Sequence, residues 1–273
     1  MERLRPKKMF GQHFLTDRNV LVRIVEAAGI SAGDRVLEVG PGRGSLTRAL
    51  ADKGAHVLAV EVDRELAPLL ENEFAACSNV EIVRGDVLQV DLRQLLVSRW
   101  DGQWKVVANL PYNISSQVLL RFLDDWQLFS RLMLMLQKEV GERLVAPPAC
   151  KEYGILSVFC RLHFDIYREF IVRPGSFYPP PAVDSLVLRF EPLPRPRADV
   201  GDEAFFRRIV KGAFGQRRKT LLNALKPVSL TEDVDNLVQA LSRCGIDGKR
   251  RGETLSLEEF AVLSRALSQT GPD

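Results

Sequence analysis

The sequence is poor in the residues that build metal sites and disulfide frameworks. Its 273 residues include four cysteines and three histidines, all dispersed, and no two cysteines form a Cys-x-x-Cys pair. Structural zinc sites need closely spaced thiols and imidazoles, and disulfide-rich secreted domains need paired cysteines. We therefore expect reduced thiols, no metal, and an intracellular protein of the cytoplasm.

Long apolar segments are also lacking. No stretch approaches the ~20 apolar residues of a membrane-spanning helix, and the first residues carry Arg and Lys where a signal peptide has its apolar core. We therefore expect no membrane contact. What is present is the composition of a globular protein, with 46% hydrophobic and 27% charged residues and a net charge of +3. The length allows one large α/β domain and a small second one, and the basic balance permits nucleic-acid binding.

Four short apolar runs predict a parallel sheet. They are residues 35–39, 56–60, 80–84 and 104–108, and helical patterns follow the first two. The residues that come directly after or close behind these runs are, in order, Gly40, Glu61, Asp86 and Asn109. The carboxyl ends of the strands in a doubly wound α/β sheet line one crevice, where ligands bind. We therefore expect a single site built from four strand ends.

A glycine-rich turn, Gly-Pro-Gly-Arg-Gly-Ser, begins at Gly40. Gly40 and Gly42 let the backbone approach a ligand closely, and Ser45 stands where a dinucleotide-binding loop has its third glycine. The turn suits either a pyrophosphate or a nucleoside with an amino-acid tail. Glu61 is placed to accept hydrogen bonds from ribose hydroxyls, and Asp86 from the amino group of an adenine. Each acid also has a simpler interpretation as a helix cap or a solvated loop residue.

The segment Asn-Leu-Pro-Tyr at 109–112 is the most informative stretch of the chain. Pro111 fixes φ and biases Leu110 toward an extended conformation, which leaves the Leu110 carbonyl available to accept a hydrogen bond. The Asn109 side chain offers a second acceptor, and Tyr112 offers a flat aromatic face. Two acceptors beside an aromatic face fit the exocyclic amino group of a planar base. The alternative is an ordinary proline turn after a buried strand.

The second half of the chain predicts further strands and then a helical tail. Phe177 precedes a proline run and could form a second aromatic face opposite Tyr112, with ordinary loop packing as the alternative. Prolines between 192 and 196 mark a linker. We expect domain boundaries at 1–192, with a basic arm at 1–16, and at 197–273. Helices are expected over 203–225, with a break at Gly215, and over 234–244 and 257–267.

Two basic clusters are candidates for contact with RNA phosphates. They comprise Lys7 and Lys8 in the arm, and Arg207, Arg208, Lys211, Arg217, Arg218 and Lys219 in the tail. A run of charge is usually a solvated face. The tail cluster, however, has no acid between Phe205 and Lys219, and we therefore predict that it binds RNA.

Several motifs together resemble those of the bacterial small-subunit rRNA adenine N6,N6-dimethyltransferases. These motifs are Phe10-Gly11-Gln12-x-Phe14-Leu15, Glu38-Val39-Gly40-Pro41-Gly42, Glu61-x-Asp63, Gly85-Asp86, Asn109-Leu110-Pro111-Tyr112-Asn113-Ile114-Ser115, and Phe177-x-Pro179-x-Pro181-x-Val183-x-Ser185. The resemblance implies a Rossmann-like class I methyltransferase sheet with a small all-helical C-terminal domain. It also implies S-adenosylmethionine as methyl donor, without a metal. The implied target is a pair of adjacent adenosines in the 3′-terminal hairpin of 16S rRNA, in an assembling 30S subunit.

The resemblance also implies roles for individual residues. The donor-binding positions are His13, Leu15, Gly40, Gly42, Glu61, Asp86, Val87 and Asn109. The catalytic positions are Asn109, Leu110, Pro111, Tyr112 and Phe177. His13 departs from the family, which usually has Asn there, so a backbone contact would survive while a side-chain amide contact would change. We expect a monomer.

Three other functions are compatible with parts of the sequence. A methyltransferase acting on large-subunit rRNA would share the catalytic motif, although the Phe-Gly-Gln arm argues against it. An NAD-dependent dehydrogenase would share the glycine-rich turn and Glu61, but it would not need the segment at 109–112. A ribosome-assembly factor would act mainly by binding immature subunits.

Overall fold

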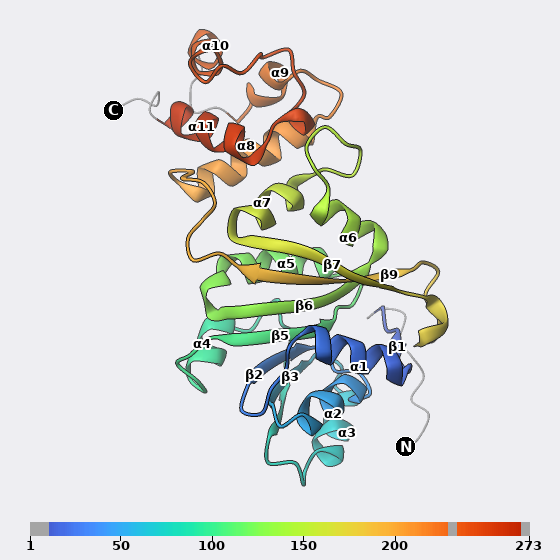
Figure 1. Ribbon diagram of the computed structural model, residues 1–273. Coiled ribbons are helices and arrows are strands. Elements are labelled where there is room, and N and C mark those ends of the chain that lie inside the picture. The colour runs from blue at the N-terminus through green and yellow to red at the C-terminus, as the bar shows by residue number, and fades with distance from the viewer. Residues whose placement is uncertain (1–10, 229–233, 269–273) are drawn as a thin grey trace. The chain divides into compact units, whose positions relative to one another are not determined.

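Figure 1 shows the computed structural model, which describes residues 11–228 and 234–268. The chain forms two compact units. The first contains the described residues up to 141 together with 165–192, and the second contains 142–164 together with the described residues from 193 onward.

The first unit is built on a seven-stranded mixed sheet in the order β4-β3-β2-β5-β6-β9-β7. Its strands are β2 (Arg35–Val39), β3 (His56–Glu61), β4 (Val80–Arg84), β5 (Trp104–Asn109), β6 (Phe129–Gln137), β7 (Phe164–Val172) and β9 (Ser185–Pro192). Strands β4, β3, β2, β5 and β6 pair in parallel, and β9 pairs with β6 in the antiparallel sense. The predicted strands and the Rossmann-like fold class are confirmed.

The helices of this unit cover both faces of the sheet. They are α1 (Arg18–Ala27), α2 (Ser45–Asp52), α3 (Leu66–Glu73), α4 (Leu92–Val97), α5 (Ser115–Asp124) and the start of α6 (Lys138–Val145). Val36, Val57 and Val107 pack in one cluster with Ile24 of α1 and Leu50 of α2. Alternate strand residues point to the opposite face. Helix α5 covers that face, because the crossover from β5 to β6 runs in the opposite direction to that from β2 to β3 and both are right-handed.

The sheet order reverses direction between β2 and β5. From β2 the chain passes outward to β3 and β4, and it then returns to β5 and continues to β6. The loops that follow β2 and β5 consequently turn away from each other and leave a crevice at the carboxyl ends of the strands. This topology brings the four predicted strand-end residues to one edge of the sheet.

A two-stranded sheet that the sequence did not predict joins the N-terminal arm to the proline-rich loop. Strand β1 (Phe14–Leu15) pairs with β8 (Phe177–Tyr178) in the antiparallel sense, with Leu15 opposite Phe177. The Thr16 backbone N–H and its hydroxyl both donate to the Ser176 carbonyl, at 2.9 and 3.1 Å. The arm is therefore held against the loop.

The second unit is helical. It contains the end of α6, α7 (Ile155–His163), α8 (Glu203–Gly215), α9 (Leu221–Leu225), α10 (Val234–Arg243) and α11 (Leu257–Ser268). The break predicted at Gly215 is confirmed, because α8 ends at that residue and the rest of the predicted helical stretch is the short helix α9. After the break, the Leu221 and Leu222 N–H groups donate to the carbonyls of Arg250 and Gly248, which replace intrahelical partners.

Residues 142–164, which the sequence prediction placed with the sheet, pack within the helical unit. The Phe159 ring lies 6.3 Å from the Phe206 ring, and the Tyr153 ring lies 5.7 Å from that of Phe214. These apolar contacts thus place α7 in the helical unit, although in the sequence it lies between two strands of the sheet. Across the described ranges, the structure contains no helix with the length and apolar character needed to cross a membrane.

Candidate active site

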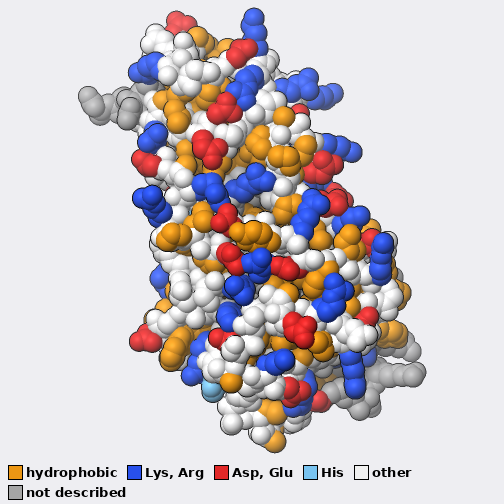
Figure 2. Space-filling view, in the orientation of Figure 1, with side chains coloured by type: hydrophobic (Ala, Val, Ile, Leu, Met, Phe, Trp, Pro, Cys, Tyr) orange, Lys and Arg blue, Asp and Glu red, His pale blue; other side chains and the backbone are white. Residues whose placement is uncertain are grey.

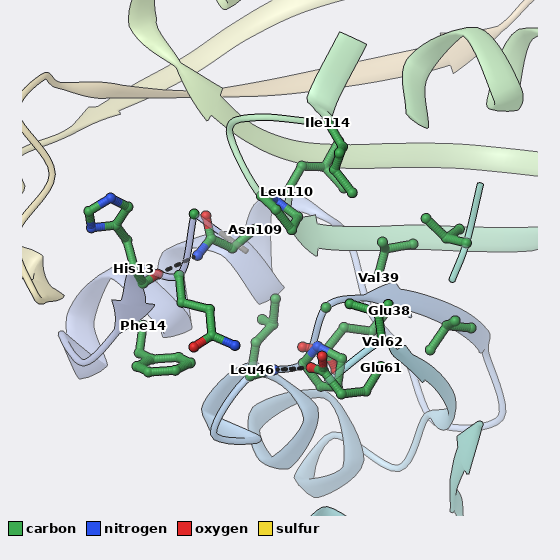
Figure 3. Close-up of a pocket in the computed structure, with 18 of the residues that line it drawn as sticks. His13, Phe14, Glu38, Val39, Leu46, Glu61, Val62, Asn109, Leu110 and Ile114 are labelled. Atoms are coloured by element: carbon green, nitrogen blue, oxygen red, sulfur yellow. Dashed lines mark hydrogen bonds between the residues drawn. The ribbon is translucent and has the colours of Figure 1, made fainter. Parts of the chain in front are cut away.

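A pocket opens in the first unit at the carboxyl ends of β2, β3, β4 and β5 (Figure 3). The loops after these strands form its walls, and residues 11–15 of the arm close one side. The predicted site residues that line it are His13, Leu15, Gly40, Gly42, Glu61, Asp86, Val87, Asn109, Leu110, Pro111 and Tyr112. Sequence positions nearly 100 apart thus meet in one cavity.

Phe177, predicted as a second aromatic face, does not line this pocket. Its side chain is 4% exposed and packs in the core with Leu15, its partner across the β1–β8 pair. Successive residues of a strand point to opposite sides, so the next residue, Tyr178, points outward and is 53% exposed. Register places Tyr178, and not Phe177, at the surface of this loop.

The glycine-rich turn approaches the arm closely. Gly42 has φ +60°, and a Cβ atom there would lie 2.8 Å from the Phe14 ring. The Arg43 guanidinium lies over the rings of Phe14 and Tyr178, at 4.8 and 5.5 Å from their centres. A side chain at Gly42 would push the arm away from the turn, so the missing Cβ atom shapes the pocket wall.

Two buried carboxyl groups stand side by side in the pocket wall. Glu61, at the end of β3, accepts hydrogen bonds from the N–H groups of Gly42 at 3.1 Å and Asp63 at 2.9 Å. Burial raises its pKa, while these N–H groups act in the opposite direction. Glu38, in β2, accepts a bond from the Thr47 hydroxyl at 2.7 Å. Burial is the main cause that raises the pKa of Glu38 to about 8. The hydrogen bond from Thr47 acts to lower this pKa, and the nearby Glu61 acts to raise it.

Glu38 is a pocket residue to which the sequence analysis gave no role. It is 2% exposed and lines the pocket two positions before Gly40. The signal that could have found it is an acid inside an otherwise apolar strand, because a buried charge is costly unless it is paired or protonated. Gln12 was also given no role in the site, and its side-chain amide donates to Asp63 at 3.1 Å.

The side-chain amide of Asn109 is held in one orientation in the pocket wall. Its side-chain nitrogen donates to the His13 carbonyl at 3.0 Å, the dashed line between these residues in Figure 3. Its Oδ1 is buried and has no hydrogen-bond partner among the described residues. The Leu110 N–H donates to the Met135 carbonyl at 3.2 Å, which fixes the segment to β6. A buried acceptor that no protein group satisfies is costly, and a ligand donor would offset that cost.

Tyr112 lines the same pocket as Asn109. Its hydroxyl hydrogen-bonds to the Ser185 side chain at the start of β9, and burial raises the pKa of that hydroxyl. Its ring stacks on the His13 imidazole, with ring centres 5.5 Å apart and planes at 28°. Asp86 is held at the pocket wall by its Oδ1, which accepts from the Leu88 N–H at 2.9 Å.

The predicted RNA-binding residues fall into different settings. Lys7 and Lys8 lie outside the described residues. Arg207 pairs with Glu203 at 2.7 Å, and Arg217 pairs with Glu253 at 2.8 Å and also donates to two backbone carbonyls. The remaining basic residues, which the structure places at exposed positions, are Arg208, Lys211, Arg218 and Lys219.

The Rossmann-like sheet with this strand-end pocket defines a class I S-adenosylmethionine-dependent methyltransferase. A dimethyladenosine transferase from Plasmodium falciparum has the same fold, with a TM-score of 0.76 and 23% identity over 94% of this chain and 98% of that one. The family model for ribosomal RNA adenine dimethylase matches residues 3–268, and the chain belongs to this family.

Relatives and a second structure agree with this assignment. A protein named ribosomal RNA small subunit methyltransferase A from Geobacter metallireducens is 58% identical over 99% of this chain and 98% of its own length. The protein of the same name from Geobacter sulfurreducens is 56% identical over 98% and 97%. The 23S rRNA methyltransferase ErmE has a TM-score of 0.67 and 25% identity over 94% of this chain and 100% of its own. The protein is therefore an rRNA adenine dimethyltransferase that uses S-adenosylmethionine.

Proposed function

We propose that this enzyme methylates N6 of two adjacent adenosines in the 3′-terminal hairpin of 16S rRNA, in the assembling 30S subunit in the cytoplasm, and that it acts as a monomer. The observation that carries the proposal is the unsatisfied Oδ1 of Asn109, in the wall of a pocket that Tyr112 also lines. The names of the Geobacter relatives support the small subunit as the target.

The residues of the pocket fit the donor, and S-adenosylmethionine supplies an electrophilic methyl group on a sulfonium when it is bound. The carboxylate of Glu61 retains acceptor capacity for ribose hydroxyls, because its two N–H bonds use only part of it. Asp86, which lines the same pocket, would accept from the adenine amino group. Gly40 and Gly42 leave room for the amino-acid tail beside the turn.

Asn109 and the Leu110 carbonyl would accept the hydrogens of the target N6. Two acceptors on these hydrogens favour a pyramidal nitrogen, whose lone pair then faces away from them. No strong base has to act first, because N6 attacks as a neutral amine and its proton leaves afterwards. Tyr112 would stack on the extruded base, a contact worth ~1–3 kcal/mol per base. The site therefore works mainly by alignment.

The helical unit is the proposed RNA-binding part. Lys and Arg side chains are spread over the face shown in Figure 2 among acidic ones, so no single basic block dominates that face. Arg207, Arg208 and Lys211 line a groove on α8, where basic side chains of one helix could follow a phosphate backbone. Methylation of large-subunit rRNA is a second candidate, because ErmE shares the fold over its full length.

One experiment separates these functions. Labelled methyl transfer from S-adenosylmethionine is measured with unmethylated small subunits, free 16S rRNA and large-subunit rRNA, followed by nucleoside analysis. Dimethyladenosine from small subunits alone is the expected result. Label in large-subunit rRNA would overturn the target assignment in favour of the second candidate. Tight binding to small subunits without label would favour a role in assembly.

A further inference from the structure

One residue, His13, contacts three other residues of the site through its backbone carbonyl and its side chain. Its backbone carbonyl accepts the bond that orients the Asn109 amide. Its Nδ1 lies 2.7 Å from the Pro179 carbonyl in the proline-rich loop. Its ring stacks on Tyr112. Figure 3 shows the imidazole directed away from Glu38 and Glu61, on the far side of the pocket from these acids.

We propose that His13 is a positioning residue that connects the donor pocket to the face that receives the target base. The proposal rests on the function proposed above and gives His13 a role other than direct contact with the donor. Its hydrogen bond to Pro179 holds the arm over the donor pocket, and its ring holds Tyr112 in the orientation that stacks on adenine.

The hydrogen bond determines the tautomer. A backbone carbonyl oxygen only accepts, so Nδ1 of His13 carries the proton in the bond to Pro179. Nε2 is then the deprotonated nitrogen of the neutral ring. This assignment has a spectroscopic signature, because nitrogen chemical shifts distinguish the two ring nitrogens of histidine.

The two contacts can be separated by substitution. Asn carries a donor nitrogen at the same number of bonds from Cα as Nδ1, so His13→Asn keeps a donor toward Pro179 and loses the ring. His13→Phe keeps an aromatic ring against Tyr112 and loses the donor. His13→Ala loses both. The backbone carbonyl that orients Asn109 is present in all three variants.

The control is Thr16→Ala. The Thr16 hydroxyl also donates to a carbonyl of the same loop, that of Ser176, and within the described ranges no hydrogen bond joins it to Tyr112 or Asn109. If general loosening of the arm explained the effects, Thr16→Ala would reproduce them.

Three measurements are made on each variant of the full chain. They are the Kd for S-adenosylhomocysteine by calorimetry, kcat and KM with unmethylated small subunits, and the thermal midpoint. His13→Asn is expected to keep the wild-type Kd within about twofold and to lower kcat/KM for subunits about 3–10-fold, because one aromatic interaction is removed. His13→Phe is expected to weaken the Kd about 3–10-fold, because one hydrogen bond is removed, with a smaller change in kcat/KM.

The proposal is overturned if His13→Ala leaves both quantities unchanged, if the two single-contact variants show the same pattern, or if Thr16→Ala matches His13→Ala. It is also overturned if the nitrogen spectrum shows the neutral His13 ring protonated on Nε2. Failure of the proposed function would look different, because the wild-type enzyme would then transfer no methyl group to small subunits. The Kd series and the nitrogen spectrum still test the His13–Pro179 bond in that event.

Discussion

The side-chain nitrogen of Asn109 lies 3.0 Å from the backbone carbonyl oxygen of His13, and this bond fixes the orientation of the amide. With the nitrogen engaged, Oδ1 is the end left without a protein partner among the described residues. A residue of the arm thus sets the orientation of a residue at the end of β5. The orientation matters for the proposed mechanism, which needs an acceptor, and not a donor, for the N6 hydrogens.

Replacing Asn109 with Ala should lower kcat about 100-fold, a typical loss for one preorganised catalytic hydrogen-bonding group. RNA affinity should stay within about twofold. Asn109→Asp should also be impaired, because its second oxygen would face the His13 carbonyl without a proton to share. Single-turnover methylation and subunit binding, measured in parallel, check both variants. Unchanged turnover in Asn109→Ala would exclude the proposed role.

Glu61→Gln should weaken binding of S-adenosylhomocysteine about 10-fold. The two carboxylate oxygens accept N–H bonds from Gly42 and Asp63, and the amide nitrogen of Gln cannot accept either one. The glycine-rich turn would lose its anchor to β3. Calorimetric titration measures the Kd, with Glu26→Gln on the exposed face of α1 as the control. An unchanged Kd would mean that the anchor is dispensable.

Titration of Glu38 should lower the free energy of unfolding as the pH rises from about 4.5 to about 8. Burial raises its pKa from 4.5 to about 8, so between these values the folded state keeps a proton that the unfolded state releases. The stabilisation that this proton gives is complete below pH 4.5 and is lost as the pH rises through about 8. A shift of this size corresponds to a few kcal/mol, to order of magnitude.

Glu38→Gln tests this assignment, since Gln stays neutral and its carbonyl oxygen can still accept from Thr47. Urea unfolding at pH 5, 7 and 9 should show a flatter pH profile for the variant and a gain in stability at pH 9. Identical profiles for the two proteins would rule out titration of Glu38 in this range.

Charge reversal at Arg208 and Lys211 should weaken subunit binding and reduce its salt dependence, because a protein that neutralises fewer phosphates releases fewer counterions when it binds. Arg217→Glu should instead lower the thermal midpoint, because Arg217 pairs with Glu253 and donates to the carbonyls of Lys151 and Tyr153. Binding isotherms at several salt concentrations, with melting curves, separate the two effects. If subunit affinity depends on salt concentration in the double variant as it does in the wild type, the groove on α8 is not part of the RNA interface.

The sequence predicted those parts of the molecule that local patterns specify. Each central strand is a short apolar run, and Gly40, Glu61 and Asn109 mark the strand ends with residues that an ordinary loop does not require. Their meeting in one pocket then follows from the parallel topology. Asp17 was also predictable as a helix cap, and it accepts bonds from the first N–H groups of α1.

What the sequence did not predict depends on contacts between distant segments. Strands β1 and β8 are two residues long, too short to show a period, and their register decides that Phe177 is buried and Tyr178 exposed. The place of α7 is set by the contact of Phe159 with Phe206. His13 showed no pattern of its own, because its contacts are with distant residues, Pro179 in the loop and Asn109 and Tyr112 at and after the end of β5.

The pairing of Leu15 with Phe177 also bears on how the enzyme matures. During synthesis the chain emerges from its N-terminus, so the arm waits for more than 160 further residues before its partner strand exists. Closing such a long loop is a late and entropically costly step. The central strands can assemble before it, but the donor pocket gains its arm wall only when the proline-rich loop arrives. A chain that ends before the proline-rich loop would therefore lack the support for this wall and is expected to bind the methyl donor more weakly than the full chain.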